Sequence, residues 1–256
     1  MNVVTWNVNS LKVRLPHLEA LIGEIRPNVI CLQETKSEDR NFPSVEIESL
    51  GYHVYFYGQK TYNGVAILSD KPMTQVAIGI PGFADDQARV IAATTEDGKR
   101  FVNVYIPNGS SVDSPKFEYK LRWLDAATKY IQAELVNYES LIMLGDFNIA
   151  PTDKDVYDPK EFEETVLCSS KERAHFENLL RLGLYDSLDK FVEGRNRFTW
   201  WDYRMNAFRR KLGLRIDHIL LTENLMNSCS SAAVLNSYRK LERPSDHAPV
   251  VVNLEI

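Results

Sequence analysis

Features that define several other classes of protein are missing from this chain of 256 residues. Its three cysteines, Cys31, Cys168 and Cys229, lack metal-binding spacing and cannot all pair. A reduced cytoplasm is therefore the expected setting. No segment approaches the ~20 apolar residues that cross a membrane. The first residues, MNVVTWNVNS, are typical of a strand and not of a signal peptide.

Motifs that hold nucleotide cofactors are also missing. Neither a Gly-x-Gly-x-x-Gly pattern nor a Walker loop occurs, so a nucleotide cofactor is not expected. Linkers, low-complexity segments and strong repeats are absent as well, which favours one domain over residues 1–256. Nothing in the sequence argues for an oligomer, so we expect a monomer.

An excess of positive charge, which nucleic-acid-binding proteins often carry, is missing too, because the net charge is −5. The charge is unevenly distributed, however. Residues 195–216 contain seven basic residues, one acid and five aromatic residues. A basic run by itself is usually a solvated face. Basic and aromatic side chains together are typical of a surface that holds phosphates and stacks against bases or sugars.

Strand-like and helical stretches are mixed along the whole chain. We expect helices after Pro16, after Ser114 and over residues 172–182, where Gly183 ends the helix. This pattern favours two packed sheets with helices outside over a doubly wound parallel sheet. The expected strands are 3–6, 29–32, 52–57, 64–68, 76–80, 89–94, 101–106, 141–144, 216–221 and 250–254.

Polar residues recur at the ends of these apolar segments. Asp146 and Asn148 follow the strand 141–144, and on an extended chain they point the same way because only one residue separates them. One such group alone is usually a turn or a cap. Five such groups in one chain are harder to explain as turns or caps, because buried carboxylates are costly unless they are paired or bind a metal. The other four groups are Asn7 with Asn9, Glu34, Asp217, and Asp246 with His247.

These groups provide the parts of metal-assisted phosphoester hydrolysis. Hard oxygen ligands such as Glu34 suit Mg²⁺ or Mn²⁺, whereas zinc prefers Cys and His clusters. A carboxylate that bonds a histidine, as in Asp246-His247, fixes its orientation and raises its basicity, so that an imidazolium faces a phosphoryl oxygen. Asp146 is a candidate for the base that deprotonates a water. Asn148 is a candidate donor of a hydrogen bond to the transition state.

The same residues belong to an ordered set of motifs: TWNVNS, LQETK, YNGVAI, VNVYIPNG, LGDFNIAP, TWWDYR, LRIDHILL and PSDHAPV. From residue 3 to residue 254 this set resembles the exonuclease III family of abasic-site DNA repair nucleases, within the endonuclease/exonuclease/phosphatase superfamily. The resemblance implies a DNase I-like, four-layer α/β sandwich in which two packed mixed β-sheets are flanked by helices. The site would lie at one end of the sandwich.

The resemblance also implies a metal site and a base. Glu34 would be the main ligand of Mg²⁺, for which Mn²⁺ can substitute, and Asp146 the base that activates water. The implied metal ligands are Asn7, Glu34, Asp146, Asn148 and Asp246.

Further catalytic roles follow from the same resemblance. Asn148 and His247 would hold phosphoryl oxygens, and Asp246 would orient His247. Asp217 would support the network. Tyr105 and Asn108 would lie near the phosphate or the leaving oxygen.

The implied DNA contacts lie outside this centre. Trp200, Leu214 and Ile216 fall where the family lines a pocket for a flipped, baseless sugar, although ordinary core packing is the alternative for all three. Such a pocket recognises a missing base by shape. The implied contacts with the duplex are Tyr62, Arg204, Arg210 and Lys211.

The implied reaction is attack of hydroxide on a phosphorus of double-stranded DNA, which leaves a 3′ hydroxyl and a 5′ phosphate. Its substrates would be abasic sites, blocked 3′ ends and normal 3′ termini. The alternatives are a non-specific nuclease or a phospholipid phosphodiesterase of the same superfamily, or a DNA-binding protein without catalysis. Leu167 is bulky where the family approaches the abasic sugar. We therefore hypothesise that 3′-end trimming is favoured over abasic incision.

Overall fold

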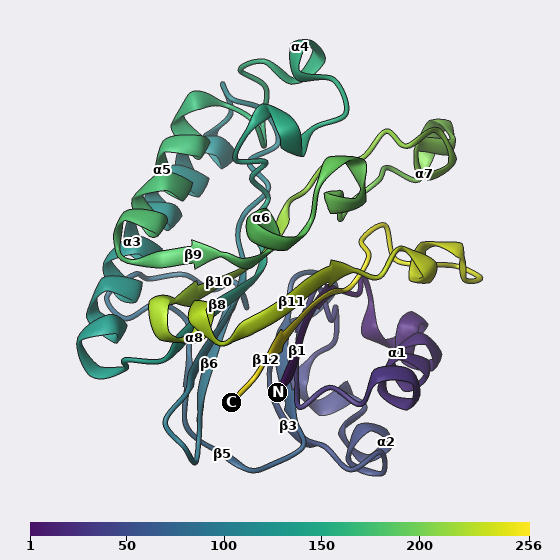
Figure 1. Ribbon diagram of the computed structural model, residues 1–256, viewed down its shortest axis with the longest axis vertical. Coiled ribbons are helices and arrows are strands. Elements are labelled where there is room, and N and C mark those ends of the chain that lie inside the picture. The colour runs from purple at the N-terminus through teal and green to yellow at the C-terminus, as the bar shows by residue number, and fades with distance from the viewer.

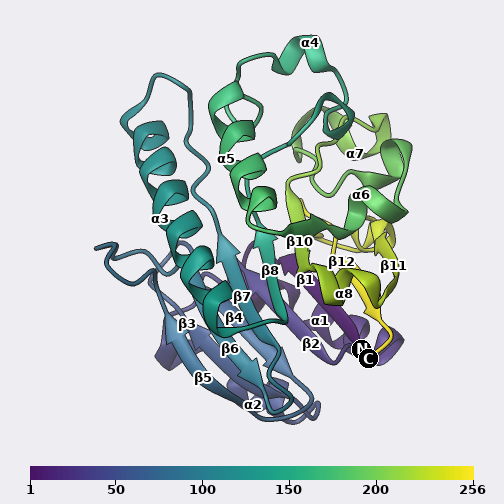
Figure 2. The same cartoon turned by 60° about the vertical axis from the view of Figure 1, so that its left-hand side comes forward.

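The uninterrupted apolar runs of the sequence are strands that are buried on both faces. In β8 (Leu141–Asp146), Ile142 and Leu144 pack in the core between two sheets, whereas Leu141 and Met143 pack against helices. A computed structural model describes residues 1–256 and contains two mixed six-stranded sheets with helices on both outer faces (Figure 1, Figure 2). The predicted four-layer sandwich is confirmed.

The first sheet combines strands from both ends of the chain. Its order is β11-β12-β1-β2-β4-β3, with β1 parallel to β2 and antiparallel to β12. Helix α1 (Leu11–Ile25) packs on its outer face through Leu18 and Leu21. The strands are β1 (Asn2–Asn7), β2 (Val29–Gln33), β3 (His53–Tyr57), β4 (Val65–Ser69), β11 (Cys229–Val234) and β12 (Val250–Leu254).

The second sheet is built from the middle of the chain. Its order is β5-β6-β7-β8-β10-β9, with β7 parallel to β8. Helices α3 (Pro115–Asn137) and α5 (Ser170–Arg181) cover its outer face, through residues such as Trp123 and Phe176. The remaining strands are β5 (Met73–Ile78), β6 (Val90–Thr95), β7 (Arg100–Tyr105), β9 (Leu184–Asp186) and β10 (Asp217–Thr222).

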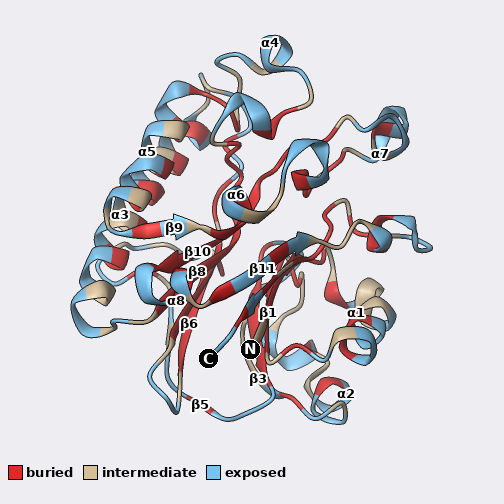
Figure 3. Cartoon of the chain, in the orientation of Figure 1, coloured by how far each residue is buried: buried red, intermediate tan, exposed pale blue.

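Short helices fill the connections. Burial is concentrated on the strands and on the helix sides that face them (Figure 3). No helix has the combination of length and apolar composition that a membrane span requires. The short α-helices are α2 (Ser44–Glu48), α4 (Pro159–Phe162), α6 (Ser187–Phe191), α7 (Ala207–Arg210) and α8 (Glu223–Asn227), and the 3₁₀ helices are η1 (Asp39–Asn41), η2 (Asp153–Asp155), η3 (Gly194–Arg197), η4 (Arg204–Asn206) and η5 (Asn236–Lys240).

The two helix starts predicted from Ser114 and from Pro16 have opposite outcomes. Ser114 caps α3 by accepting the Phe117 N–H at 3.2 Å, with Pro115 in the first turn, which confirms that prediction. The prediction that Pro16 begins a helix is wrong, because α1 begins at Leu11. The N–H of Leu11 bonds the carbonyl of Thr35 at 3.0 Å, so the loop after β2 anchors an earlier first turn.

The topology brings the polar strand ends to one end of the sandwich. Asn7 ends β1, and Glu34 directly follows the parallel neighbour β2. In the second sheet Tyr105 of β7 is paired with Asp146 of β8, which is in turn paired with Asp217 of β10. Since parallel strands end at the same edge, side chains far apart in sequence gather there.

Gly145, the residue before Asp146, has no room for a side chain. Its φ is +144°, and a Cβ there would lie 1.9 Å from the carbonyl oxygen of Val104 in β7. We expect Gly145→Ala to lower the free energy of unfolding by roughly 2–3 kcal/mol, through backbone strain and displacement of β7. Urea unfolding monitored by circular dichroism measures this change.

The matched control is Gly23→Ala in α1, where a Cβ would meet nothing within 4 Å. In a helix interior this change should raise the free energy of unfolding by about 0.5–1 kcal/mol. Equal stability of the two variants would contradict the close approach of β7 and β8.

Candidate active site

Three side chains from three distant parts of the chain form the centre of the site. Ligand atoms of Glu34, Asp146 and His247 lie within 4.8 Å of one another. The Asn7 amide joins two of them, since its Nδ2 donates to Glu34 Oε1 at 2.8 Å and to Asp146 Oδ2 at 2.9 Å. These carboxylate oxygens are ligand types that a hard divalent cation prefers. The Asn7 amide oxygen, predicted as a further ligand, accepts the Asn9 N–H at 3.0 Å instead. The group is therefore chemically suited to hold a metal ion.

The turn after β8 holds Asp146 and Asn148 by a local hydrogen bond. The strand ends at Asp146, and Asn148 has a left-handed φ of 50°, so the two residues are not on one extended chain as predicted. Instead the Asn148 N–H donates to Asp146 Oδ1 at 2.9 Å, while Phe147 between them is buried in the core. Asparagine tolerates this left-handed conformation better than most residues.

The Asn148 side chain is held by a second strand end. Its Nδ2 donates to the carbonyl of Ile106 at 3.0 Å, and its Oδ1 accepts from Asn108 Nδ2 at 3.1 Å. Asn108 and Asn148 thus lie side by side. Each amide keeps one N–H that these two hydrogen bonds do not use.

His247 is oriented by Asp217 and not by Asp246. Its Nδ1 lies 2.8 Å from Asp217 Oδ2, and its Nε2 faces Asp146 Oδ2 at 3.7 Å. The prediction that Asp246 orients His247 is therefore wrong. Adjacent residues point in different directions here, and Asp246 accepts hydrogen bonds from Asn9 Nδ2 and Trp200 Nε1, both at 2.9 Å.

Burial shifts the acid–base properties of this centre. Burial raises the pKa of Asp146, the Asp217 charge adds to that effect, and the charge of His247 opposes it, with a resulting pKa of about 7. Burial lowers the pKa of His247, but the charges of Asp217 and Asp146 outweigh it and raise that pKa to about 10. At neutral pH the imidazole is therefore protonated, and the shared negative charge of the carboxylates favours binding of a cation.

Tyr105 completes the wall of the site as a neutral phenol. Burial, followed by the charges of Glu34 and Asp146, raises its pKa well above the ordinary value. Arg89 lies over its ring, with the guanidinium carbon 4.7 Å from the centroid, and Arg89 Nη1 donates to the Tyr105 carbonyl at 3.0 Å. The phenol keeps its hydrogen and can donate it to a phosphate or leaving oxygen.

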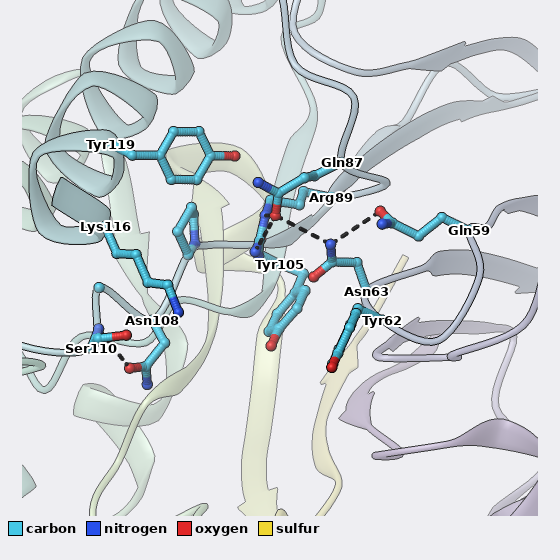
Figure 4. Close-up of a pocket in the computed structure, with 12 residues that line it drawn as sticks. Gln59, Tyr62, Asn63, Gln87, Arg89, Tyr105, Asn108, Ser110, Lys116 and Tyr119 are labelled. Atoms are coloured by element: carbon cyan, nitrogen blue, oxygen red, sulfur yellow. Dashed lines mark hydrogen bonds between the residues drawn. The ribbon is translucent and has the colours of Figure 1, made fainter.

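A polar recess lies beside Tyr105 and Asn108 (Figure 4). A chain of amides forms one wall, in which Asn63 Nδ2 donates to Gln59 Oε1 at 3.0 Å and to Gln87 Oε1 at 3.2 Å. Tyr62 borders this recess and is 66% exposed, which is compatible with its predicted contact in a groove.

A second recess is lined mainly by apolar side chains. Trp200, Leu214 and Leu167 line it together with Tyr157, Phe162 and Val166. Ile216 does not line it, which corrects its predicted place in the pocket wall. Its side chain is 2% exposed and packs in the cluster behind the recess with Ala150 and Cys168, as the alternative of core packing expects.

The predicted basic contacts are spread over the exposed end of this region. Arg204 lines the apolar recess and is paired with Asp202, Nη2 to Oδ2, at 2.6 Å. Arg210 and Lys211 are exposed at the end of α7 and line neither recess. Their contact with a duplex stays a prediction.

Sequence reasoning missed several residues that support the site. Lys36 Nζ lies 3.0 Å from Glu34 Oε2 and 2.6 Å from Asn9 Oδ1. Ser245 Oγ donates to the Asn7 carbonyl at 2.6 Å and accepts the His247 N–H at 3.2 Å. Lys36 is two residues after Glu34 in LQETK and Ser245 stands in PSDH, so the motifs contained both, but no local pattern distinguishes them.

This sandwich, with an acidic centre and an imidazole at one end, is the architecture of a phosphoester hydrolase. The chain belongs to the Endonuclease/Exonuclease/phosphatase family, whose model matches residues 4–247. It is 37% identical to exodeoxyribonuclease III of Haemophilus influenzae over 98% of both chains. The exonuclease III type predicted from the motifs is thereby confirmed.

Solved structures agree with this assignment. The structure of 3′ phosphatase NExo (D146N) from Neisseria bound to a product DNA hairpin is 47% identical, with a TM-score of 0.98 and complete coverage of both chains. An AP endonuclease from Archaeoglobus fulgidus is 35% identical, with a TM-score of 0.95 and the same coverage. The chain is thus similar to enzymes with two different substrate preferences.

The pairing of Asp217 with His247 can be tested in the protein freed of metal by a chelator. We expect Asp217→Asn to lower the pKa of His247, because the carboxylate charge that opposes burial is lost. NMR titration of the imidazole resonances measures this pKa. Asp246→Asn is the matched control and should lower that pKa less, since Asp246 makes no hydrogen bond to the ring. A larger effect of Asp246→Asn would reverse the assignment.

Proposed function

We propose that this chain is a Mg²⁺-dependent DNA repair phosphodiesterase that hydrolyses double-stranded DNA at 3′ ends and abasic sites and leaves a 3′ hydroxyl. The observation that carries the proposal is the convergence of Glu34, Asp146 and the Asp217–His247 pair at one end of the sandwich. Membership in the exonuclease III type and the DNA product held by the Neisseria relative support the substrate class.

The acid–base properties assign different roles to Asp146 and His247. Burial raises the pKa of Asp146, so its carboxylate is a stronger base than that of an exposed aspartate and is suited to accept a proton from the attacking water. His247, with a pKa of about 10, stays protonated and acts as a hydrogen-bond donor to a phosphoryl oxygen. Asn148 and Asn108 add neutral donors beside it.

The carboxylate oxygens of Glu34 and Asp146 fit a metal, and the Asn7 amide holds both of them. Mg²⁺ bound there supplies Lewis-acid stabilisation of negative charge on the phosphate, and Mn²⁺ can substitute for it. Asn148 borders this position, and Asp246 is connected to it through Asn9. We infer Mg²⁺ because a site with hard oxygen ligands and few protein carboxylates binds Mg²⁺ more readily than Zn²⁺, which prefers Cys and His ligands.

Two recesses flank the centre. We infer that one receives the DNA strand and that the other receives a sugar flipped out of the duplex. The polar recess with Tyr62 suits a sugar–phosphate backbone, and the apolar recess of Trp200 and Leu214 suits a baseless sugar. The net charge of the chain is −5, which does not by itself favour phosphate binding. Positive charge is available locally, however, from the exposed Arg204, Arg210 and Lys211.

We also infer that the chain acts as a single domain and as a monomer. The centre takes Asn7 from the first strand, Asp146 from the middle and His247 from near the last strand, so no part of the chain holds it alone. Three free, buried cysteines are consistent with a cytoplasmic location.

Two labelled duplexes test the function. One carries an internal abasic analogue and the other a recessed 3′ end, each incubated with Mg²⁺ or with EDTA. We expect hydrolysis in Mg²⁺ and none in EDTA. Glu34→Gln should reduce the rate by roughly 10²-fold or more, since stabilisation of charge in the transition state is lost. Full activity of the wild-type protein in EDTA, or no cleavage of either duplex in Mg²⁺, would refute the proposal.

Leu167 provides a test of substrate preference. It is 8% exposed in the wall of the apolar recess and has a left-handed φ of 77°. We expect Leu167→Gly to raise abasic incision relative to 3′-end trimming, because it enlarges the recess. The fold should tolerate it, since glycine adopts this φ without strain. Initial rates on the two duplexes give the ratio.

The matched control for this test is Leu167→Met, which keeps the side-chain volume and should leave the ratio unchanged. If Leu167→Gly and Leu167→Met give the wild-type ratio alike, the bulk of Leu167 does not decide substrate preference.

A further inference from the structure

A fully buried ion pair lies behind the site and has no part in the proposed reaction. Lys120 of α3 and Glu172 of α5 are both 0% exposed, and Lys120 Nζ donates to Glu172 Oε1. Burying two charges is expensive, and such a pair is often no more stabilising than apolar residues of the same volume. Its contacts therefore matter more than its contribution to stability.

The lysine connects the two loops that hold the phosphate-binding asparagines. Lys120 Nζ donates to the carbonyl of Asn148 at 2.6 Å and to the carbonyl of Asn108 at 3.1 Å, in addition to Glu172. Three acceptors use all three hydrogens of an ammonium, so the charged form is the one that satisfies every partner. One buried group thus sets the separation of the Asn108 and Asn148 backbones.

Packing around the lysine stem restricts the Asn108 loop further. Gly109 has a φ of +95°, and a Cβ there would lie 3.2 Å from Cδ of Lys120. The loop therefore lies directly against the stem. Since the two asparagine side chains also bond each other, a shift of either backbone moves the amide hydrogens that face the phosphate.

The glutamate connects the same unit to the wall of the apolar recess. Glu172 Oε1 accepts the N–H of Leu167 at 3.0 Å, and Oε2 accepts the N–H and the hydroxyl of Ser169 at 3.2 and 2.5 Å. Leu167 in turn accepts the Ala150 N–H at 2.8 Å, two residues after Asn148. Its left-handed backbone is thereby held at both its N–H and its carbonyl.

We propose that the Lys120–Glu172 pair is a positioning unit that holds Asn108 and Asn148 against the phosphate and couples them to Leu167. Neither residue touches substrate. The inference rests on the proposed function, because it assigns the pair to transition-state geometry on one side and to substrate choice on the other.

The sharpest test is the apolar double variant Lys120→Met/Glu172→Met, which keeps volume and removes both charges. Such replacements are often neutral or stabilising. Here, however, we expect a cooperative thermal transition at a lower temperature than in the wild type, because backbone groups of Asn108, Asn148 and Leu167 lose their partners. For molecules that remain folded, kcat on the recessed 3′ end should fall roughly 10²-fold, since misplacement by about 1 Å costs that much. KM should change by less than about threefold, because the lost interaction is made in the transition state.

A second ion pair on the same helix is the matched control. Glu134 of α3 accepts from Arg100 Nε of β7 at 2.5 Å, far along the helix from Lys120 and outside the site. Glu134→Gln should lower Tm and leave kcat unchanged. Lys120→Gln should lower Tm and also lower kcat per folded molecule, measured at least 15 °C below each Tm.

The double variant should also change the ratio of abasic incision to 3′-end trimming, because the N–H of Leu167 loses its acceptor. Wild-type kcat and ratio in a folded double variant would overturn the positioning role. If the double variant does not fold, a kcat of Lys120→Gln equal to that of Glu134→Gln overturns it instead. A wild-type protein without activity on either duplex would refute the proposed function, which is a separate result.

Discussion

The concentration of buried carboxylates at one end of the sandwich is the constraint on which the rest of this structure depends. Glu34, Asp146 and Asp217 lie together with a single imidazolium, His247, between two of them. Carboxylates in such a place are unfavourable unless hydrogen-bond donors and positive charge surround them. Asn7 and Lys36 supply part of that environment, and the grouping of Glu34, Asp146 and His247 is typical of a metal-dependent family. The charges of Asp217 and Asp146 raise the pKa of His247, and burial, together with the charge of Asp217, raises that of Asp146.

The two packed sheets make this concentration possible. Parallel pairs β1/β2 and β7/β8 each deliver two strand ends to the same edge, and the packing of the sheets brings the two edges together. The close approach of β7 and β8 leaves no room for a side chain at Gly145, the residue before Asp146. Behind this edge, buried ion pairs hold the loops that no strand controls. The Lys120–Glu172 pair does so for the loops of Asn108 and Asn148. Asn148 also has a left-handed backbone, which no sheet hydrogen bond would maintain.

Much of the centre was predictable because each of its residues stands in a short motif at a strand end. The errors have separate physical causes. Adjacent residues in a turn can point in opposite directions, so the sequence neighbours Asp246 and His247 do not bond each other, and Asp217, 30 residues away, orients the imidazole. Ile216 lies one residue from Asp217 and alternation turns it into the core. Pro16 was a local signal for a helix start that the tertiary contact of Leu11 with Thr35 overrode.

The sequence by itself determined which chemical groups are available, the two-sheet class and the kinship with exonuclease III, because apolar periodicity and ordered motifs are local properties. Tertiary structure alone decided which carboxylate bonds His247 and which residues line the apolar recess. It also decided that a lysine and a glutamate 52 positions apart connect both asparagine loops to Leu167. These choices depend on the packing of the two sheets and on side-chain direction in irregular turns. Neither follows from local patterns, since contacts between distant segments are set by burial of the whole core.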